Sequence, residues 1–225
     1  MTTDARSWRS RRVSRAVAVA LCASSLGAGS VGLAASPASA GLLSTVAGLL
    51  PSCAARPTST PFAPWGDTRT YFAMPGGGFE SGAAGWTLAG GAKVVAGNEP
   101  WFVNGTTTDA HSLAIPSNAR ATAPTVCVSM GDNTIRFFVK NSGVVSSVLH
   151  VQAYVQNPLT GLVLSTGFDI KGGASTGWSP SPALLIPNLL GGVLGTQNLT
   201  LVFTASGTPA TWNIDDVFVD PFKSR

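Results

Sequence analysis

The sequence predicts an all-β domain, either a sandwich or a barrel, that begins after a separate N-terminal segment. From the Gly-Gly-Gly run at 76–78 onward, short stretches of β-branched and aromatic residues are separated by Gly, Asn, Pro and Ser, which is typical of strands joined by turns. One stretch, 147–156, alternates strictly between apolar and polar residues, as a strand with one buried face does. Strands are expected at nine places: 84–89, 92–96, 111–115, 120–128, 133–140, 147–156, 162–170, 198–206 and 211–219.

The first forty residues have the three parts of a secretory signal peptide. Five arginines lie before residue 16, an Ala-rich apolar run follows, and Ser-Pro-Ala-Ser-Ala places small residues at Ala38 and Ala40. We therefore expect residues 1–40 to be a signal peptide that is cleaved after Ala40, and the mature protein to be secreted. The alternative is an uncleaved membrane anchor, because the apolar run is longer than usual. No later segment resembles a membrane span.

Removing this leader makes the chain neutral. The leader holds five of the 14 Lys and Arg residues but only Asp4 of the 10 Asp and Glu residues, which leaves nine of each sign. With no basic run after residue 15, the mature chain lacks the charge pattern that binds nucleic acid or an anionic membrane surface.

Residues 41–68 are expected to lead into the domain, which then covers 69–225. A short apolar helix precedes Pro51, because Leu42, Val46 and Leu49 are spaced along one helical face. An irregular stretch rich in Pro, Ser, Thr and Ala follows to residue 68.

Two cysteines remain after the leader, Cys53 and Cys127. In an oxidising compartment an even pair predicts a disulfide, which here would close a loop of 127 − 53 = 74 residues and pin the lead-in to the domain. Two lone cysteines are a poor metal site.

A surface for a polyhydroxylated ligand is predicted on two strands. In 147–156, His150, Gln152 and Tyr154 share the side opposite the apolar residues, and in 133–140 Arg136 and Phe138 lie on the outer side. If these two strands pair as neighbours, their outer faces form one surface of imidazole, amide, guanidinium and aromatic groups, which suits a sugar. The alternative is an ordinary solvent-facing sheet.

The tryptophans are expected to divide between core and loops. Trp86 and Trp212 lie within apolar alternation and are expected in the core, whereas Trp101 follows Asn-Glu-Pro in a loop and could present its ring to a ligand. The segment 183–194 is strongly apolar but broken by Pro187, and is expected to be a loop folded over one sheet or an exposed contact patch.

Acidic residues mark the two ends of the domain: Glu80 near its start, and Asp215 and Asp216 inside an apolar strand near its end. A carboxylate in an apolar strand is costly unless something compensates it. Calcium binds carboxylate and carbonyl oxygens from separate segments, so a structural calcium is expected at these residues, with Asp109 as a further ligand and Glu99 in a loop outside the site. The alternative is that Asp215 and Asp216 point outward from an edge strand.

Catalysis is not expected. After the leader the only histidines are His111 and His150, so no zinc-hydrolase spacing exists, and the chain has no Gly-x-Ser-x-Gly elbow, phosphate loop or dinucleotide fingerprint. A glycosidase needs two carboxylates beside a sugar. Glu80 and Asp215 could resemble such a pair although they are expected to bind calcium.

Three motifs carry a resemblance to a known family. Gly-Gly-Phe-Glu-Ser-Gly-Ala-Ala-Gly-Trp at 77–86, Ser-Leu at 112–113 and Trp-Asn-Ile-Asp-Asp-Val at 212–217 resemble the galactose-binding-like jelly-roll domains, which include many carbohydrate-binding modules. The stretch 65–221 more closely resembles uncharacterised secreted proteins of high-GC Gram-positive bacteria. The resemblance implies a two-sheet antiparallel jelly-roll β-sandwich whose first and last strands are neighbours, with calcium held by Glu80 and Asp215, and also by Asp216.

The function expected on this basis is a secreted, non-catalytic module that binds carbohydrate or cell-wall glycan. The alternative is a structural or protein-interaction domain of the cell surface with the same fold.

Overall fold

The computed structural model describes residues 53–221, apart from 130, 174–175, 188–194 and 208. The predicted signal peptide and the predicted helix before Pro51 lie outside the described residues. In chain order the elements are the 3₁₀ turn η1 (Ala63–Trp65) and the strands β1 (Phe72–Ala73), β2 (Thr87–Ala89), β3 (Lys93–Ala96), β4 (His111–Pro116), β5 (Arg120–Thr122), β6 (Val126–Val128), β7 (Asp132–Asn141), β8 (Val148–Gln156), β9 (Val163–Lys171), β10 (Ser179–Pro180), β11 (Leu184–Leu185), β12 (Gln197–Ser206) and β13 (Thr211–Pro221).

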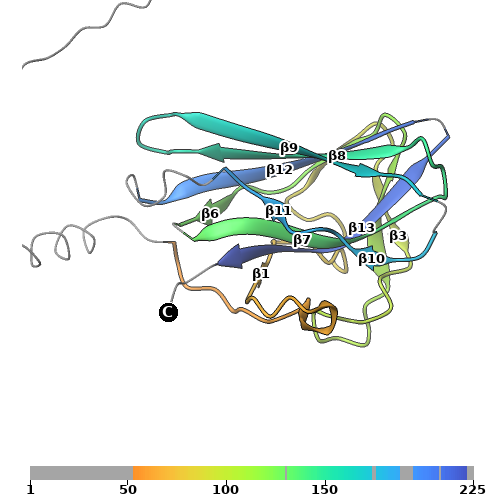
Figure 1. The fold of residues 1–225 in the computed structure, drawn as a ribbon, viewed down its shortest axis with the longest axis horizontal. Helices are drawn as coiled ribbons and strands as arrows, with labels where there is room; N and C mark the ends of the chain where they lie inside the picture. Colours follow the sequence, from red (N-terminus) through yellow and green to blue (C-terminus); the bar gives the residue numbers. More distant parts are fainter. Residues whose placement is uncertain (1–52, 130, 174–175, 188–194, 208, 222–225) are drawn as a thin grey trace, which may run out of the picture. The chain divides into compact units, whose positions relative to one another are not determined.

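The strands form two antiparallel sheets. The seven-stranded sheet has the order β10-β7-β13-β4-β3, with β1 paired to β13 and β11 to β7; the six-stranded sheet has the order β2-β5-β12-β8-β9, with β6 paired to β12. The chain passes repeatedly between the two sheets, as in a jelly roll, and the first strand pairs with the last. The predicted jelly-roll sandwich is confirmed, and Figure 1 shows β8, β9 and β12 in one layer and β7 and β13 in the other.

The structure has thirteen strands in its described residues rather than about nine. The predicted strand 120–128 is interrupted around Pro124 and becomes β5 and β6. Three further strands, β1, β10 and β11, have two residues each, which is too short to leave a periodic pattern in the sequence.

The predicted pairing of strands 133–140 and 147–156 is wrong. These strands are β7 and β8, and they belong to different sheets. Two packed sheets lie about 10 Å apart and six extended residues reach roughly 20 Å, so the connection at 142–147 is long enough to cross the sandwich as well as to form a hairpin.

The main core lies between the two sheets. On β8 the predicted inward residues Leu149, Val151, Ala153 and Val155 are at most 1% exposed. Trp86 and Trp212 belong to the same buried cluster, which confirms their prediction as core residues.

A second apolar cluster covers the outer face of the seven-stranded sheet. Phe62 of the lead-in and Tyr71, which follows it, pack there against Phe138 of β7 and Phe218 of β13. The lead-in, orange in Figure 1, runs along this side of the sandwich. The predicted disulfide between Cys53 and Cys127 is formed and ties the beginning of this segment to β6 of the other sheet.

The segment expected as a loop over one sheet is only partly described. Leu184 and Leu185 form β11, which extends the seven-stranded sheet beside β7, and Leu184 is buried in the main core. Within the described part of the chain, no helix is long and apolar enough to cross a membrane.

Candidate functional site

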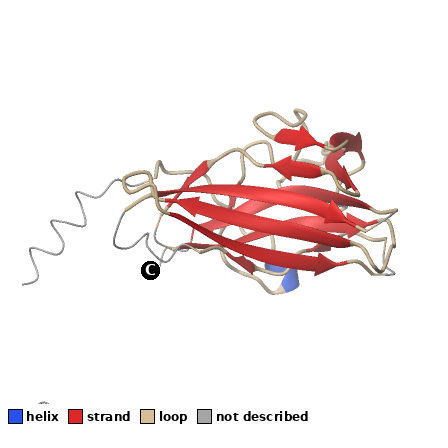
Figure 2. Cartoon of the chain, turned by 90° about the horizontal axis from the view of Figure 1, so that it is seen from above, coloured by secondary structure: helices blue, strands red, loops and turns tan. Residues whose placement is uncertain are grey.

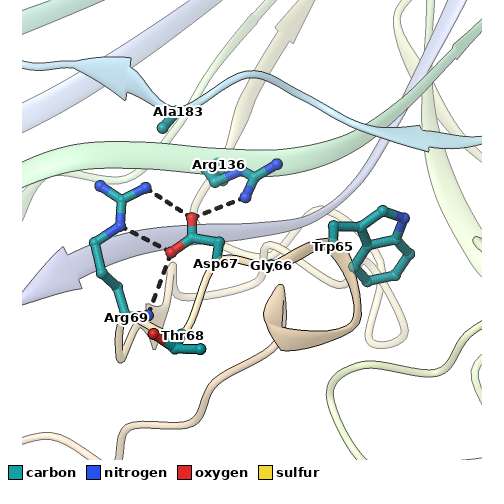
Figure 3. Close-up of a pocket in the computed structure, with 7 residues that line it drawn as sticks. All are labelled: Trp65, Gly66, Asp67, Thr68, Arg69, Arg136 and Ala183. Carbon is teal, nitrogen blue, oxygen red and sulfur yellow. Dashed lines mark hydrogen bonds and ion pairs between the residues drawn. The ribbon is translucent and has the colours of Figure 1, made fainter.

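A hollow of about 460 Å³ opens on the outer side of the seven-stranded sheet, where the lead-in meets β7 (Figure 3). Gly66 ends η1 with a left-handed φ of 79°, a conformation that glycine adopts without strain, and the chain then passes along the hollow. The lining residues are Trp65, Gly66, Asp67, Thr68, Arg69, Arg136 and Ala183.

Asp67 is the centre of an ion-pair network in this hollow. Its Oδ2 accepts hydrogen bonds from Arg69 Nη2 at 2.7 Å, Tyr71 Oη at 2.7 Å and Arg136 Nη1 at 2.8 Å, and its Oδ1 accepts one from Arg69 Nε at 2.8 Å. Burial raises the pKa of Asp67, but these hydrogen bonds outweigh burial and hold the pKa well below its usual range. Arg136 also donates from Nε and Nη2 to the carbonyl of Ser181 at 3.0 and 2.8 Å.

Two indole rings stand beside the hollow. The rings of Trp65 and Trp101 meet edge to face at 4.9 Å, and each packs on Phe138, at 5.3 and 5.4 Å respectively. Trp101 is 43% exposed, whereas Phe138 is fully buried beneath the two indoles. The Trp101 ring is therefore held by aromatic contacts and is partly exposed to solvent.

The position of Trp101 depends on Glu99. The Glu99 side chain is fully buried, and its two carboxylate oxygens accept the backbone N–H groups of Trp101 and Val103. The N–H of Glu99 in turn donates to Asp215 Oδ2 at 3.2 Å. The expectation that Glu99 lies in a loop apart from the acidic residues is therefore wrong.

Asp215 and Asp216 lie in a buried acidic cluster. They are 2% and 4% exposed, and β13 is a central strand between β7 and β4, so the alternative of an outward-facing edge strand is wrong. Burial, followed by the charge of Asp216, raises the pKa of Asp215 to about 9; burial, followed by the charges of Glu99 and Asp109, raises that of Asp216 to about 8. In the described residues, Asp216 Oδ2 is buried without a hydrogen-bond partner.

Glu80 has partners of its own. Its Oε1 accepts the N–H groups of Ala110 and His111 at 3.0 and 2.7 Å, and its Oε2 lies 3.0 Å from His111 Nδ1. Glu80 thus braces the start of β4, next to Asp109. Among the residues that the structure describes, no group of three or more His, Cys, Asp or Glu side chains is placed to hold a metal ion.

The predicted ligand residues divide between the two faces of the sandwich. Arg136 lines the hollow, whereas Phe138 is buried next to it and carries the Trp101 ring on its outer side. His150, Gln152 and Tyr154 lie on the outer face of the six-stranded sheet, so the prediction of one shared surface is wrong. Figure 2 looks onto the long strands from above, with the helical turn η1 on the far side.

The outer face of the six-stranded sheet carries polar side chains. Tyr154 Oη donates to Gln152 Oε1 at 3.1 Å, and Gly167, opposite Gln152 on β9, has open space where a side chain would stand. Sugar binding by this face stays a prediction.

No role is predicted from the sequence for Trp65, Asp67 or Arg69, which lie in or beside the stretch interpreted as an irregular lead-in. The one available signal was Trp-Gly-Asp-Thr-Arg at 65–69, which places an aromatic residue and two opposite charges directly after a stretch of small residues and prolines.

No protein-family model matches this chain, and no curated protein matches it. Among solved structures, it is similar to the CBM22-1 xylan-binding domain from Paenibacillus barcinonensis, with 15% identity over 76% of this chain and 100% of that domain and a TM-score of 0.47. It is also similar to TmCBM61, solved with β-1,4-galactotriose, with 15% identity over 66% of this chain and 97% of the other and a TM-score of 0.44. Likenesses of this degree do not identify a ligand, and the resemblance to secreted proteins of high-GC Gram-positive bacteria stays a prediction.

Proposed function

We propose that this chain is a secreted carbohydrate-binding module and that the hollow beside Trp101 is its binding site. The observation that carries the proposal is the half-exposed Trp101 ring, which buried Glu99 holds in place against Trp65, an indole that lines the polar hollow. A sugar presents apolar C–H faces that stack on an indole and hydroxyls that need hydrogen-bond partners, and the hollow supplies both kinds of contact.

The charges in the hollow favour a neutral sugar. Asp67 pairs with both Arg69 and Arg136, and Arg69 also lies 3.4 Å from Asp220 Oδ2, so a ligand meets two cations that are matched by two carboxylates. A guanidinium has five N–H donors, so Arg136 can offer more than the three that bind Asp67 and the Ser181 carbonyl. The volume of about 460 Å³ lies within the roughly 300–1,000 Å³ of small-molecule sites.

Export is part of the proposal. The leader lies outside the described residues, but the formed disulfide fits an oxidising compartment, as does the signal-peptide pattern of residues 1–40.

Binding to an array of neutral glycans and to peptidoglycan tests the proposed site. Trp101→Ala should weaken binding of the wild-type ligand at least about tenfold, because an exposed aromatic anchor is lost. Thermal unfolding should show that the variant is still folded at the assay temperature. The matched control is Tyr154→Ala, which removes a half-buried ring from the opposite face and should leave binding unchanged.

Two outcomes would count against this function. Loss of binding in Tyr154→Ala with retention in Trp101→Ala would move the site to the six-stranded sheet. Failure of the wild type to bind any glycan would favour the alternative of a structural or protein-interaction domain.

We further propose a structural calcium at the buried acidic cluster. Asp216 offers an unpaired, buried carboxylate oxygen, and hard oxygen ligands are those that calcium prefers. Asp216 and Asp109 would hold the ion, and Glu80 and Asp215 would brace the segments that carry them. The ion would supply the positive charge that the clustered carboxylates otherwise lack.

The melting temperature with and without a chelator should show whether the acidic cluster binds calcium. With free calcium at a hundred times its dissociation constant, removal of the ion costs about 2.7 kcal/mol and lowers the melting temperature by about 5–10 °C. Asp216→Asn should abolish that response, and asparagine tolerates the φ of 46° that Asp216 adopts. Asp169→Asn, an exposed carboxylate on the other face, should keep it. If no ion binds, Asp216→Asn should instead raise the melting temperature at neutral pH with or without chelator, because burial beside Glu99 disfavours the ionised form of Asp216 and asparagine carries no charge.

A further inference from the structure

Three side chains on the outer face of the six-stranded sheet form a hydrogen-bonded chain of serine, histidine and aspartate. His150 Nδ1 lies 2.6 Å from Asp169 Oδ1, and His150 Nε2 lies 3.0 Å from Ser206 Oγ. The three residues come from β8, β9 and β12, so they are far apart in the sequence and do not form a local sequence motif.

The partners of His150 set its tautomer. The hydrogen bond from His150 and the charge of Lys171, whose Nζ lies 3.5 Å from Asp169 Oδ2, keep the pKa of Asp169 below its usual value. An ionised carboxylate only accepts hydrogen bonds, so the neutral ring of His150 carries its proton on Nδ1. Its Nε2 then presents a lone pair toward Ser206 Oγ at 3.0 Å, closer than the Val148 carbonyl, the other acceptor of this hydroxyl, at 3.4 Å. This is the arrangement in which histidine acts as a general base toward a serine.

The strands hold these groups in register. His150 stands directly opposite Asp169 on β9 and opposite Thr204 on β12, two residues before Ser206. Strands fix side chains more firmly than loops do, which favours a preorganised site. Arg120 stands opposite Thr204 on β5, so the same face also carries a cation.

We propose that Ser206 is a nucleophile, activated by His150 and Asp169, that accepts an acyl group from an ester. Ser206 Oγ attacks the acyl carbon while its proton passes to His150 Nε2. The bond to the alcohol oxygen then breaks, and that oxygen takes the proton from Nε2. Water next attacks the acyl-serine and gives a proton to Nε2, which returns it to Ser206 Oγ as the carboxylic acid leaves. The step consumes only ester and water.

The exposure of the three groups limits the substrate class. The side chains of His150 and Asp169 are 42% and 47% exposed, so water screens the charges that would stabilise a demanding transition state. Esters, whose alcohol leaves readily, are therefore within reach, and amides are not. An open face also accepts a small acyl group carried on a large, hydroxylated polymer, such as an O-acetylated polysaccharide.

A serine-directed probe tests the nucleophile without the natural substrate. The full secreted chain is incubated with a fluorophosphonate and, separately, with p-nitrophenyl acetate. We expect one phosphonyl group on Ser206 by peptide mass spectrometry, and slow release of p-nitrophenol. Ser206→Ala should abolish both signals, and His150→Asn should slow both by a factor of about 100. Asp169→Asn should also slow both, because the ring then loses the acceptor that sets its tautomer.

Ser165→Ala, an exposed serine of the same face that lies outside the triad, is the matched control and should react like the wild type. The melting temperature of each variant shows that the fold is kept. Labelling spread over several serines, or labelling of Ser206 at the wild-type rate in His150→Asn, would overturn the proposal. Because Ser206 and the hollow beside Trp101 lie on opposite faces, loss of sugar binding in Trp101→Ala leaves this reactivity untouched, so the two proposals fail independently.

Discussion

Asp67→Ala is expected to lower the free energy of unfolding by about 3–5 kcal/mol, the cost of leaving a buried charge without its partner. The side chains of Asp67 and Arg136 are 10% and 11% exposed and meet at 2.8 Å. Removing the carboxylate leaves Arg136 over the Phe62 ring with the Ser181 carbonyl as its remaining acceptor among the described residues. Arg69 and Tyr71 also lose their hydrogen bonds to Asp67. Urea unfolding followed by tryptophan fluorescence measures the change.

The control for this prediction is Asp169→Ala, which breaks solvent-exposed contacts with His150 and Lys171 and should change the free energy of unfolding far less. The double variant Asp67→Leu/Arg136→Met replaces both partners of the pair. It should recover much of the free energy of unfolding that Asp67→Ala loses, because neither charge of the pair then remains buried. An Asp67→Ala variant as stable as the wild type would show that the network contributes nothing to folding.

Acid should act on the same network. The pKa of Asp67 is lower in the folded state than in the unfolded state, so its contribution is complete above the unfolded value of about 3.9 and is lost as the pH falls further. The stability difference between wild type and Asp67→Ala should therefore shrink below about pH 4.

Removal of the disulfide is expected to cost about 4 kcal/mol, because the bond closes a loop of 74 residues in the unfolded chain. Cys53 and Cys127 are each partly exposed, so reductant can reach them. Cys53→Ala with Cys127→Ala should match the reduced wild type in urea unfolding, and reductant should not affect the double variant.

The native lead-in should stay docked without this bond. Arg56 donates to the Cys127 carbonyl and stacks on Phe72, and Phe62 remains packed on Phe138. The lower stability is thus expected to come from the greater freedom of the unfolded chain and not from lost contacts in the folded protein. A folded structure with a detached lead-in would contradict this explanation.

The fold could be predicted from the sequence because each long strand has its own pattern of apolar and polar residues. The alternation of 147–156 correctly placed Leu149 and Val151 inside and His150 and Gln152 outside. Which sheet a strand joins is decided by contacts far along the chain, and no local pattern distinguishes a crossing connection from a hairpin of the same length. For this reason Arg136 and His150 were placed on one face when they occupy two.

The candidate site could be predicted only in part, because its contacts join residues that are far apart in the chain. Trp101 was recognisable as a loop aromatic, but its support by Glu99 depends on a contact between residues 99 and 215. The serine, histidine and aspartate chain joins three strands, and each member taken alone looks like an ordinary solvent-facing residue.

The position of β13 has a consequence for the order of folding. This strand, Thr211–Pro221, pairs with β7, β4 and β1, all of which precede it in the chain. Until residues 211–221 have been synthesised, those three strands lack the partner that joins them, and the seven-stranded sheet cannot close over the core. Folding dominated by such distant pairings is slow. A ribosome-bound chain that stops before Thr211 therefore stays open and sensitive to protease, and a holdase has time to capture it.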